Sequence, residues 1–251
     1  MRLLRVLAKL LHLLQHIALG WWIIRRHFPL LDDTQREQRV QAWSLRMLQV
    51  LGITLKVQGT PPAQGPLLLV ANHISWLDIV VIHAAGYCRF VSKSDVKHWP
   101  IVGTLATGSG TLYIERTSRR DAMRVVHHMA ERLRVGDVLA VFPEGTTGDG
   151  RSMLPFHANL LQAAISANAP VLPLALRFVD VHTGAMHFAP SFVGDETLLG
   201  SLWRTLGASS LGAEVHFGVP EWAAGRDRRT WAHDLQTAVE QLRGASPRSL
   251  F

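Results

Sequence analysis

The chain is organised around Val70-Ala71-Asn72-His73-Ile74-Ser75-Trp76-Leu77-Asp78. It closes the apolar run 66–71, which is short, continuous and entered from Gly65-Pro66, as is typical of a buried strand. A second apolar run, with helical spacing, begins near Trp76. The sequence therefore predicts a strand, a turn and a helix, with four polar residues at the turn: Asn72, His73, Ser75 and Asp78. In an open α/β sheet, ligands bind at such turns, outside the carboxyl ends of the strands.

The spacing of His73 and Asp78 restricts how their side chains can meet. On a regular helix five residues rotate by about 500°, so the two side chains would diverge by about 140°. They meet only if His73 lies in the turn and Asp78 in the first helical turn, with Ser75 as the N-cap at capping-box spacing. A carboxylate on one imidazole nitrogen makes the other a general base for an alcohol proton. The alternative is an ordinary turn histidine beside a helix-start acid, so the pair needs support from elsewhere in the chain.

The composition favours one α/β domain with an acidic partner. Of the 251 residues 48% are apolar and 18% charged, and the mean hydropathy is +0.14. A net charge of +7 predicts anionic lipid or an acidic carrier as partner. Nucleic acid is not expected, because no long Lys/Arg run is interleaved with aromatic residues. The single Cys88 excludes an internal disulfide and lacks companions at metal-ligand spacing, so we expect a reducing cytoplasm and no metal or cofactor.

The first 51 residues predict two helices at a membrane. The apolar run 10–24 is shorter than the about 20 residues of a span and contains His12 and His16. Basic residues flank and punctuate it: Arg2, Arg5, Lys9, Arg25 and Arg26. We expect a helix in or entering one leaflet, on the cytoplasmic face of the inner membrane, with packing on its own domain as the alternative. A second helix, over about 34–51, follows a cap at Asp32.

The remaining chain alternates strands and helices, which predicts an α/β domain with a mixed sheet flanked by helices. Strands are expected at 53–57, 66–71, 89–92, 111–114, 138–142 and 169–176, and near 185–193 and 211–219. The prolines of 169–176 argue for a sheet edge or a bulge. We divide the chain into membrane-associated helices at 1–51, an α/β domain at 52–243 and a tail at 244–251. The order of the strands in the sheet does not follow from the sequence.

A second polar loop follows the predicted strand 138–142. It reads Pro143-Glu144-Gly145-Thr146-Thr147-Gly148-Asp149-Gly150, with glycines where backbone can approach a ligand closely. The alternative is an ordinary turn.

Four separated motifs together resemble the glycerolipid acyltransferase family, which includes 1-acylglycerol-3-phosphate acyltransferases. Asn72–Asp78 is similar to the family's His-x4-Asp box, and Gly110–Arg116 to its second box. Phe142–Thr146 matches the third box and Val171–Leu174 the fourth, and the stretch Lys93–Gly103 is also similar. The resemblance covers about residues 40–220.

The resemblance implies an enzyme that moves a fatty acyl group from an acyl-carrier protein or coenzyme A thioester to a lysolipid hydroxyl. In that chemistry His73 deprotonates the hydroxyl and Asp78 holds the imidazole, so no Ser or Cys nucleophile is needed. The resemblance also implies substrate-binding residues: Lys93, Arg116, Glu144, Gly145, Thr146 and Arg151. Backbone N–H groups at Val171 and Leu172 are the candidates for binding the oxyanion.

Thr147 departs from the family pattern, which usually continues Glu-Gly-Thr-Arg. Glu-Gly-Thr-Thr followed by Gly-Asp-Gly resembles the branch that includes lyso-ornithine lipid acyltransferases, whose acceptor carries an amino-acid head. The acceptor therefore stays open between lysophosphatidate and lyso-ornithine lipid.

Three other classes are weighed against this interpretation. A serine hydrolase needs Gly-x-Ser-x-Gly, and Gly108-Ser109-Gly110 lacks that spacing. A P-loop protein needs Gly-Lys-Ser/Thr, which is missing. A non-enzymatic membrane scaffold explains the basic start and the eight Trp residues, but not the polar residues at the strand ends.

Overall fold

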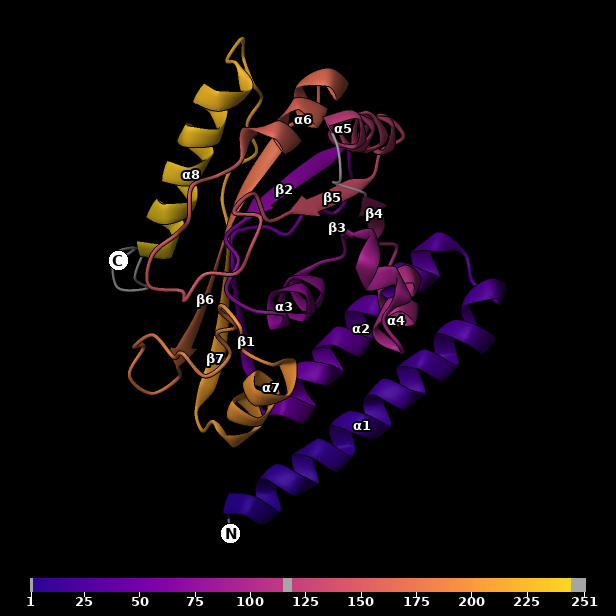
Figure 1. The fold of residues 1–251 in the computed structure, drawn as a ribbon, viewed down its shortest axis with the longest axis vertical. Helices are drawn as coiled ribbons and strands as arrows, with labels where there is room; N and C mark the ends of the chain where they lie inside the picture. Colours follow the sequence, from indigo (N-terminus) through magenta and orange to yellow (C-terminus); the bar gives the residue numbers. More distant parts are fainter. Residues whose placement is uncertain (1, 115–118, 245–251) are drawn as a thin grey trace.

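The predicted central strand, β2 (Leu67–Ala71), lies in the middle of a seven-stranded sheet in the computed structural model, which describes residues 2–114 and 119–244 (Figure 1). The strand order is β1-β7-β6-β2-β5-β3-β4. The other strands are β1 (Thr54–Gln58), β3 (Arg89–Lys93), β4 (Leu112–Ile114), β5 (Val138–Val141), β6 (Val171–Asp180) and β7 (Leu211–Phe217). Strands β6 and β7 pair antiparallel and the other neighbours pair parallel, so the predicted mixed sheet is confirmed.

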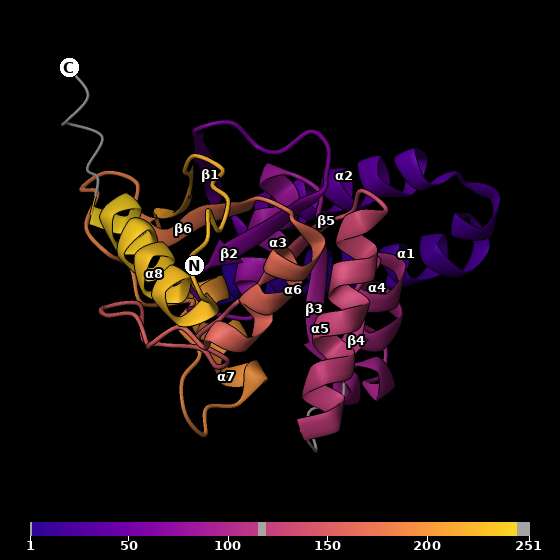
Figure 2. The same ribbon diagram turned by 90° about the horizontal axis from the view of Figure 1, so that it is seen from above.

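Both faces of the sheet are covered by helices, which explains why β2 is apolar throughout. Leu67, Leu69 and Ala71 belong to one core, and Leu68 and Val70 to the other, because successive strand side chains point to opposite faces. The second core is closed by α5 (Arg119–Arg134), α6 (Leu161–Ala167) and α8 (Arg228–Gly244). The first is closed by α3 (Leu77–Ala85), α7 (Leu198–Gly207) and the N-terminal helices (Figures 1 and 2).

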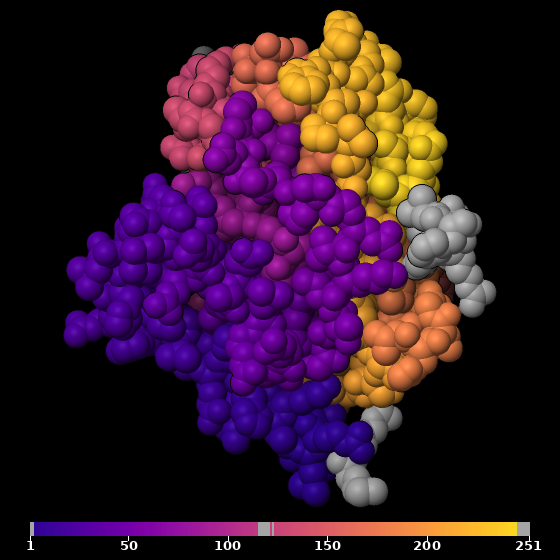
Figure 3. Space-filling model, turned by 180° about the vertical axis from the view of Figure 1, so that it is seen from behind, coloured from indigo at the N-terminus to yellow at the C-terminus, as the bar shows by residue number. Residues whose placement is uncertain are grey.

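The N-terminal helices α1 (Arg2–Arg26) and α2 (Asp33–Leu51) form the predicted hairpin through the short turn η1 (Phe28–Leu30). Asp32 caps α2 in a complete capping box, because its side chain accepts from Gln35 N and the Gln35 side chain accepts from Asp32 N. Val6 and Leu13 of α1 are buried in the first core, with Leu67 and Leu69 of β2. Seen from behind, the hairpin and the sheet domain form one continuous surface (Figure 3).

The opposite face of α1 is apolar and exposed. Its large exposed side chains are Leu3, Leu4, Leu7, Leu11, Leu14, Leu19 and Trp22. The stretch Leu3–Arg26 is long and apolar enough to cross a membrane, a test that buried core helices and signal sequences also pass. Helix α1 thus packs on its own domain and also presents the exposed apolar face that binding to a membrane requires.

Strand β6 corrects one expectation from the sequence. It lies between β7 and β2, so the predicted sheet edge is wrong, and the alternative, a bulge, is confirmed. Between the pairs Val171–Glu221 and Leu174–Phe217, β6 contributes two residues and the facing chain three. Pro173 lies at this bulge and accepts a hydrogen bond from Gly218 N at 2.9 Å. The strand expected near 185–193 is also wrong, since that segment makes only the isolated bridge Val179–Met186 among the described residues.

Between β3 and β4 the chain forms η2 (Ser94–His98) and α4 (Val102–Gly108), and η3 (Ala158–Leu160) precedes α6. Helix α4 contacts η2 and the second half of α1 (Figure 1). Of the tail expected at 244–251, only Gly244 lies within the described residues.

We predict that His83 makes folding sensitive to mild acid. His83 of α3 is buried, its Nε2 lies 3.0 Å from Cys88 O, and burial lowers its pKa to about 4. The unfolded chain takes up this proton near pH 6.5, whereas the folded chain resists it, so stability is lost as the pH falls through this window. The loss should be about 2 kcal/mol between pH 7 and 5. Thermal unfolding at both pH values should show a smaller drop in Tm for His83→Phe than for wild type; equal drops would contradict the assignment.

Candidate active site

Three neighbouring parallel strands bring polar residues to one edge of the sheet. His73 follows β2, Glu144 follows β5, and Lys93 ends β3, and the strand order places β2, β5 and β3 side by side. The carboxyl ends of parallel strands meet at the same edge. These polar residues therefore gather at the end of the sheet where the sequence predicts a site.

His73 and Asp78 are hydrogen-bonded, as their spacing requires. His73 Nδ1 lies 2.8 Å from Asp78 Oδ2, with His73 in the turn and Asp78 in the first turn of α3. Because an ionised carboxylate only accepts, Nδ1 carries the hydrogen and Nε2 has a free lone pair. Asp78 is fully buried, and the His73 side chain is 19% exposed. This arrangement leaves a basic nitrogen at the surface of the site and its partner away from water.

The peptide N–H groups of the turn hold Asp78 in place. Asp78 Oδ2 accepts from Ile74 N at 2.6 Å and from Ser75 N at 2.9 Å, in addition to His73. Asp78 Oδ1 is buried and has no partner among the described residues. The predicted N-cap is one residue too early: α3 begins at Leu77 and its N-cap is Trp76. The Ser75 hydroxyl accepts from Leu77 N, so only the other half of the predicted capping box, from Ser75 N to Asp78 Oδ2, is present.

Phe142 fixes the plane of the imidazole, a role that the sequence did not reveal. Its ring stacks on that of His73 with centroids 3.9 Å apart and planes 7° apart. Phe142 follows β5, so the contact depends on β2 and β5 being neighbours. The only feature of the sequence that points to this contact is an aromatic residue between a buried strand and Pro-Glu-Gly.

Asn72 extends the sheet past the end of β2, a second role that was missed. Its Nδ2 donates to Leu176 O at 3.0 Å, and its Oδ1 accepts from Leu176 N at 2.8 Å. These two bonds replace the next backbone pair between β2 and β6, whose ladder ends at Ala71–Leu174. The turn that carries His73 is thereby tied to a rigid strand.

Glu144 joins the two polar loops. It is buried, Oε1 accepts from His73 N at 2.7 Å, and Oε2 accepts from Leu154 N at 2.7 Å. Burial raises the pKa of Glu144, and the two backbone N–H groups counteract part of that effect. Since both oxygens are engaged, these contacts favour a positioning role for Glu144 over direct contact with an acceptor.

Replacing Glu144 by glutamine should cost stability and activity together. The amide has one accepting oxygen, so its NH₂ group would face either His73 N or Leu154 N, donor against donor. We expect a loss of about 1–3 kcal/mol in the free energy of unfolding, with a lower kcat because the His73 backbone shifts. Chemical denaturation and turnover check both, against Glu131→Gln on the exposed surface of α5. A denaturation midpoint equal to that of the control would refute the positioning role.

The remaining predicted substrate-binding residues that the structure describes are exposed. Gly145, at φ +73°, and Thr146 are exposed, and so is Lys93 at the end of β3. The Arg151 guanidinium lies over the Phe188 ring, 4.8 Å from its centroid. Arg116 lies outside the described residues.

Thr147 stands where the family pattern has arginine, and its hydroxyl is already engaged. Its Oγ1 donates to Phe192 O, and Phe192 N donates to Ile74 O at 3.1 Å. The segment before α7 is thus hydrogen-bonded to both polar loops. At this position Thr147 contributes an uncharged hydroxyl where the family pattern has a positive charge.

The structure contradicts the oxyanion donors predicted at Val171 and Leu172. Val171 pairs with Leu68 at the start of β2, at the sheet edge opposite to His73, and its N–H donates to Glu221 O at 2.8 Å. Leu172 is buried in the parallel ladder opposite Leu69. The error arises because the sequence does not show that the strand containing Val171 runs parallel to β2, which places its first residues at the end of the sheet away from His73. Within residues 2–114 and 119–244, no group of three or more His, Cys, Asp or Glu could hold a metal ion.

Comparison with known proteins supports the assignment to a family. The family model described as Acyltransferase matches residues 53–177. A lyso-ornithine lipid O-acyltransferase of Pseudomonas aeruginosa is 36% identical over 94% of this chain and 92% of its own. A 1-acyl-sn-glycerol-3-phosphate acyltransferase of Neisseria meningitidis is 39% identical over 78% of this chain and 77% of its own. The crystal structure of the 1-acyl-sn-glycerophosphate acyltransferase PlsC of Thermotoga maritima shares the fold, with a TM-score of 0.71, 20% identity and coverage of 99% of this chain and 100% of that chain.

Proposed function

Because the chain belongs to the acyltransferase family, as the relative that is 36% identical over 94% of it shows, we propose that it acylates the hydroxyl of a lysolipid, with His73 as general base. The donor is the thioester of an acyl-carrier protein or of coenzyme A. The observation that carries the proposal is the 2.8 Å bond from His73 Nδ1 to the buried Asp78, which leaves Nε2 free to take a proton.

The reaction needs one proton transfer in each direction. Nε2 of His73 takes the hydroxyl proton as the acceptor oxygen attacks the thioester carbonyl carbon. The C–S bond then breaks, the imidazolium returns the proton to the departing thiolate, and the products are an ester and a free thiol. Asp78 stabilises the imidazolium between the two steps, and Phe142 and Glu144 keep the ring and its backbone in position.

Two acceptors fit this chemistry, a 1-acylglycerol-3-phosphate and a lyso-ornithine lipid. The names of the relatives divide between them. Thr147, which offers no positive charge and is bonded to Phe192 O, favours the acceptor that lacks a phosphomonoester. Arg151 follows the same loop, and its guanidinium lies over the Phe188 ring. If the guanidinium moves off that ring, it supplies a positive charge for the phosphate-bearing acceptor.

The test is an assay of purified protein with acyl-carrier-protein thioester and each acceptor in turn, followed by coenzyme A thioester with the better one. We expect ester formation with at least one acceptor. Exclusive use of the phosphomonoester would eliminate the ornithine-type alternative. Release of free fatty acid without any ester would refute the proposed function.

The exposed face of α1 supports binding to the cytoplasmic face of the inner membrane. Seven large apolar side chains on that face are exposed, and the chain carries a net charge of +7. A lipid substrate also reaches a membrane-bound enzyme without crossing water.

Substituting glutamate for Leu11 and Leu14 together should weaken vesicle binding by at least about 100-fold, because each leucine contributes about 1.5–3 kcal/mol when buried in lipid. Vesicle sedimentation measures this effect. Val135→Glu with Val219→Glu is the matched control, since both valines are exposed away from α1. Equal binding by the α1 variant and the control would contradict the membrane role of this face.

A further inference from the structure

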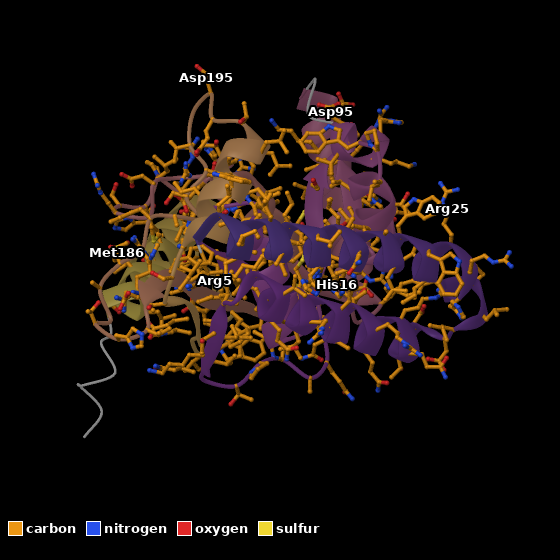
Figure 4. All side chains as sticks on the ribbon, turned by 90° about the horizontal axis from the view of Figure 1, so that it is seen from below. Arg5, His16, Arg25, Asp95, Met186 and Asp195 are labelled. Carbon is orange, nitrogen blue, oxygen red and sulfur yellow. The ribbon has the colours of Figure 1, made fainter. Side chains whose placement is uncertain are left out.

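A groove of about 470 Å³ lies between the end of α1, the start of α2 and the η2–α4 segment. Ile24 and Phe28 form its apolar part, and none of its lining residues belongs to the site around His73. Gly108 packs so closely on Ile24 that a Cβ there would lie 2.5 Å from Ile24 Cδ1, which holds α4 against α1. Figure 4 labels Arg25 at this end of α1 and Asp95 in η2, which are on two of the elements that border the groove.

Three cations line the groove and no acid does: Arg25, Arg36 and Lys97. Arg36 is partly neutralised, because its NH1 pairs with Asp33 at 3.2 Å. Arg25 lies over the Trp21 ring at 4.8 Å, and Lys97 Nζ lies 6.0 Å from the centroid of the Tyr113 ring. Within the described part of the chain no acid forms an ion pair with Arg25 or Lys97. The groove therefore has an unbalanced positive charge at a fixed place.

The other functions of these cations do not account for the cluster. A basic residue in the last turn of a helix interacts with the helix dipole, which explains Arg25. Lys97 likewise lies in the last turn of η2. Arg36 donates from Nε to Phe28 O at 3.0 Å and pairs with Asp33. These local contacts account for each cation separately, but not for all three lining one groove. Three separate elements contribute one cation each to the same surface, and that convergence is the mark of an anion site.

Exposed apolar residues adjoin the lining residues of the groove along the chain. Trp22 and Leu30 belong to the hairpin, and Trp99 and Ile101 follow Lys97. Tryptophan beside lysine and arginine is the combination found at the boundary between lipid tails and headgroups. The groove opens at one end of the helix whose outer face carries the exposed leucines.

We propose that this groove binds the phosphate of an anionic phospholipid in the bilayer, a lipid that the enzyme does not transform. Arginine and lysine donate charge-assisted hydrogen bonds to the phosphate oxygens, and the adjoining Trp22 and Trp99 lie at the level of the headgroups. The lipid chains stay in the leaflet beside the outer face of α1. The proposal goes beyond the catalytic function and does not depend on it, since the groove is separate from His73.

The test compares two double variants that lose the same charge. One is Arg25→Ala with Lys97→Ala; its matched control is Arg124→Ala with Arg229→Ala, exposed residues of α5 and α8 on the opposite face of the sheet. Flotation with phosphatidylcholine vesicles, with and without phosphatidylglycerol, measures binding. Each cation near an anionic surface contributes about fivefold, so we expect the groove variant to lose about 25-fold on phosphatidylglycerol vesicles and little on phosphatidylcholine alone. The control should bind like wild type.

A third variant, Thr104→Phe, fills the groove without changing its charge, and should lose phosphatidylglycerol binding as well. Equal losses in the groove and control double variants, or full binding by Thr104→Phe, would show diffuse attraction and overturn the proposal. Displacement of the vesicles by inorganic phosphate at constant ionic strength would identify a free-phosphate site and overturn the lipid assignment. Turnover in detergent micelles should be unchanged in all variants, so loss of vesicle binding and failure of the proposed catalysis remain distinguishable.

Discussion

Replacing His73 with alanine should lower kcat for acyl transfer by about 10²- to 10⁴-fold, the usual contribution of a positioned general base. The thermal unfolding temperature should stay within a few degrees of wild type. The ring is partly exposed, and the two backbone N–H groups that bind Asp78 remain, so the turn keeps most of its hydrogen bonds. The pairing of a large kinetic effect with a small stability effect distinguishes a catalytic role from a structural one.

Steady-state turnover and thermal unfolding of the same preparation check this result. His128→Ala is the matched control, because that side chain is exposed on α5. Retained turnover in the His73 variant would refute the base assignment. A collapse of the unfolding temperature would instead assign His73 to the fold.

Replacing Asp78 with asparagine should lower kcat by about 10³-fold and should lower the free energy of unfolding only modestly. The amide oxygen can occupy the position of Oδ2 and accept from Ile74 N, Ser75 N and His73 Nδ1, so the geometry is preserved. What disappears is the negative charge beside the imidazolium, an attraction of about 4 kcal/mol at an effective dielectric constant near 20. The new NH₂ group takes the place of Oδ1, which has no partner among the described residues, and adds a modest cost.

Asp78→Ala separates the two contributions. It removes the acceptor as well as the charge, and leaves Ile74 N and Ser75 N buried without a partner, so activity and stability should both fall. Comparing kcat and the free energy of unfolding for the two variants measures the effects separately. Wild-type kcat in Asp78→Asn would show that the charge is not needed, and would reduce Asp78 to a capping residue.

Local features could be predicted from the sequence because they depend on near neighbours. The run 66–71 predicts β2, Asp32 predicts the start of α2, and five-residue spacing predicts how His73 reaches Asp78. Each follows from a strand period, a cap or a turn, and each is confirmed. The resemblance of four motifs then supplied the reaction class that no single motif could.

Features that depend on strand order could not be predicted. Phe142 stacks on the His73 ring, and Glu144 accepts from His73 N, only because β5 lies beside β2. No local sequence pattern shows that these two strands are neighbours. Val171 fails as an oxyanion donor for a related reason, since its position at the start of a parallel strand puts it at the opposite edge. The prolines of β6 predict either a sheet edge or a bulge, and only the strand order distinguishes the two.

In the proposed mechanism the lipid hydroxyl itself attacks the thioester, and no covalent acyl-enzyme forms. The direct test varies acyl thioester and lysolipid concentrations together in initial-rate measurements, and incubates the protein with labelled acyl thioester in the absence of acceptor. The proposed mechanism predicts intersecting double-reciprocal lines and no label on the protein, because donor and acceptor must be bound together. Parallel lines with labelled protein are the signature of a ping-pong enzyme and would contradict it.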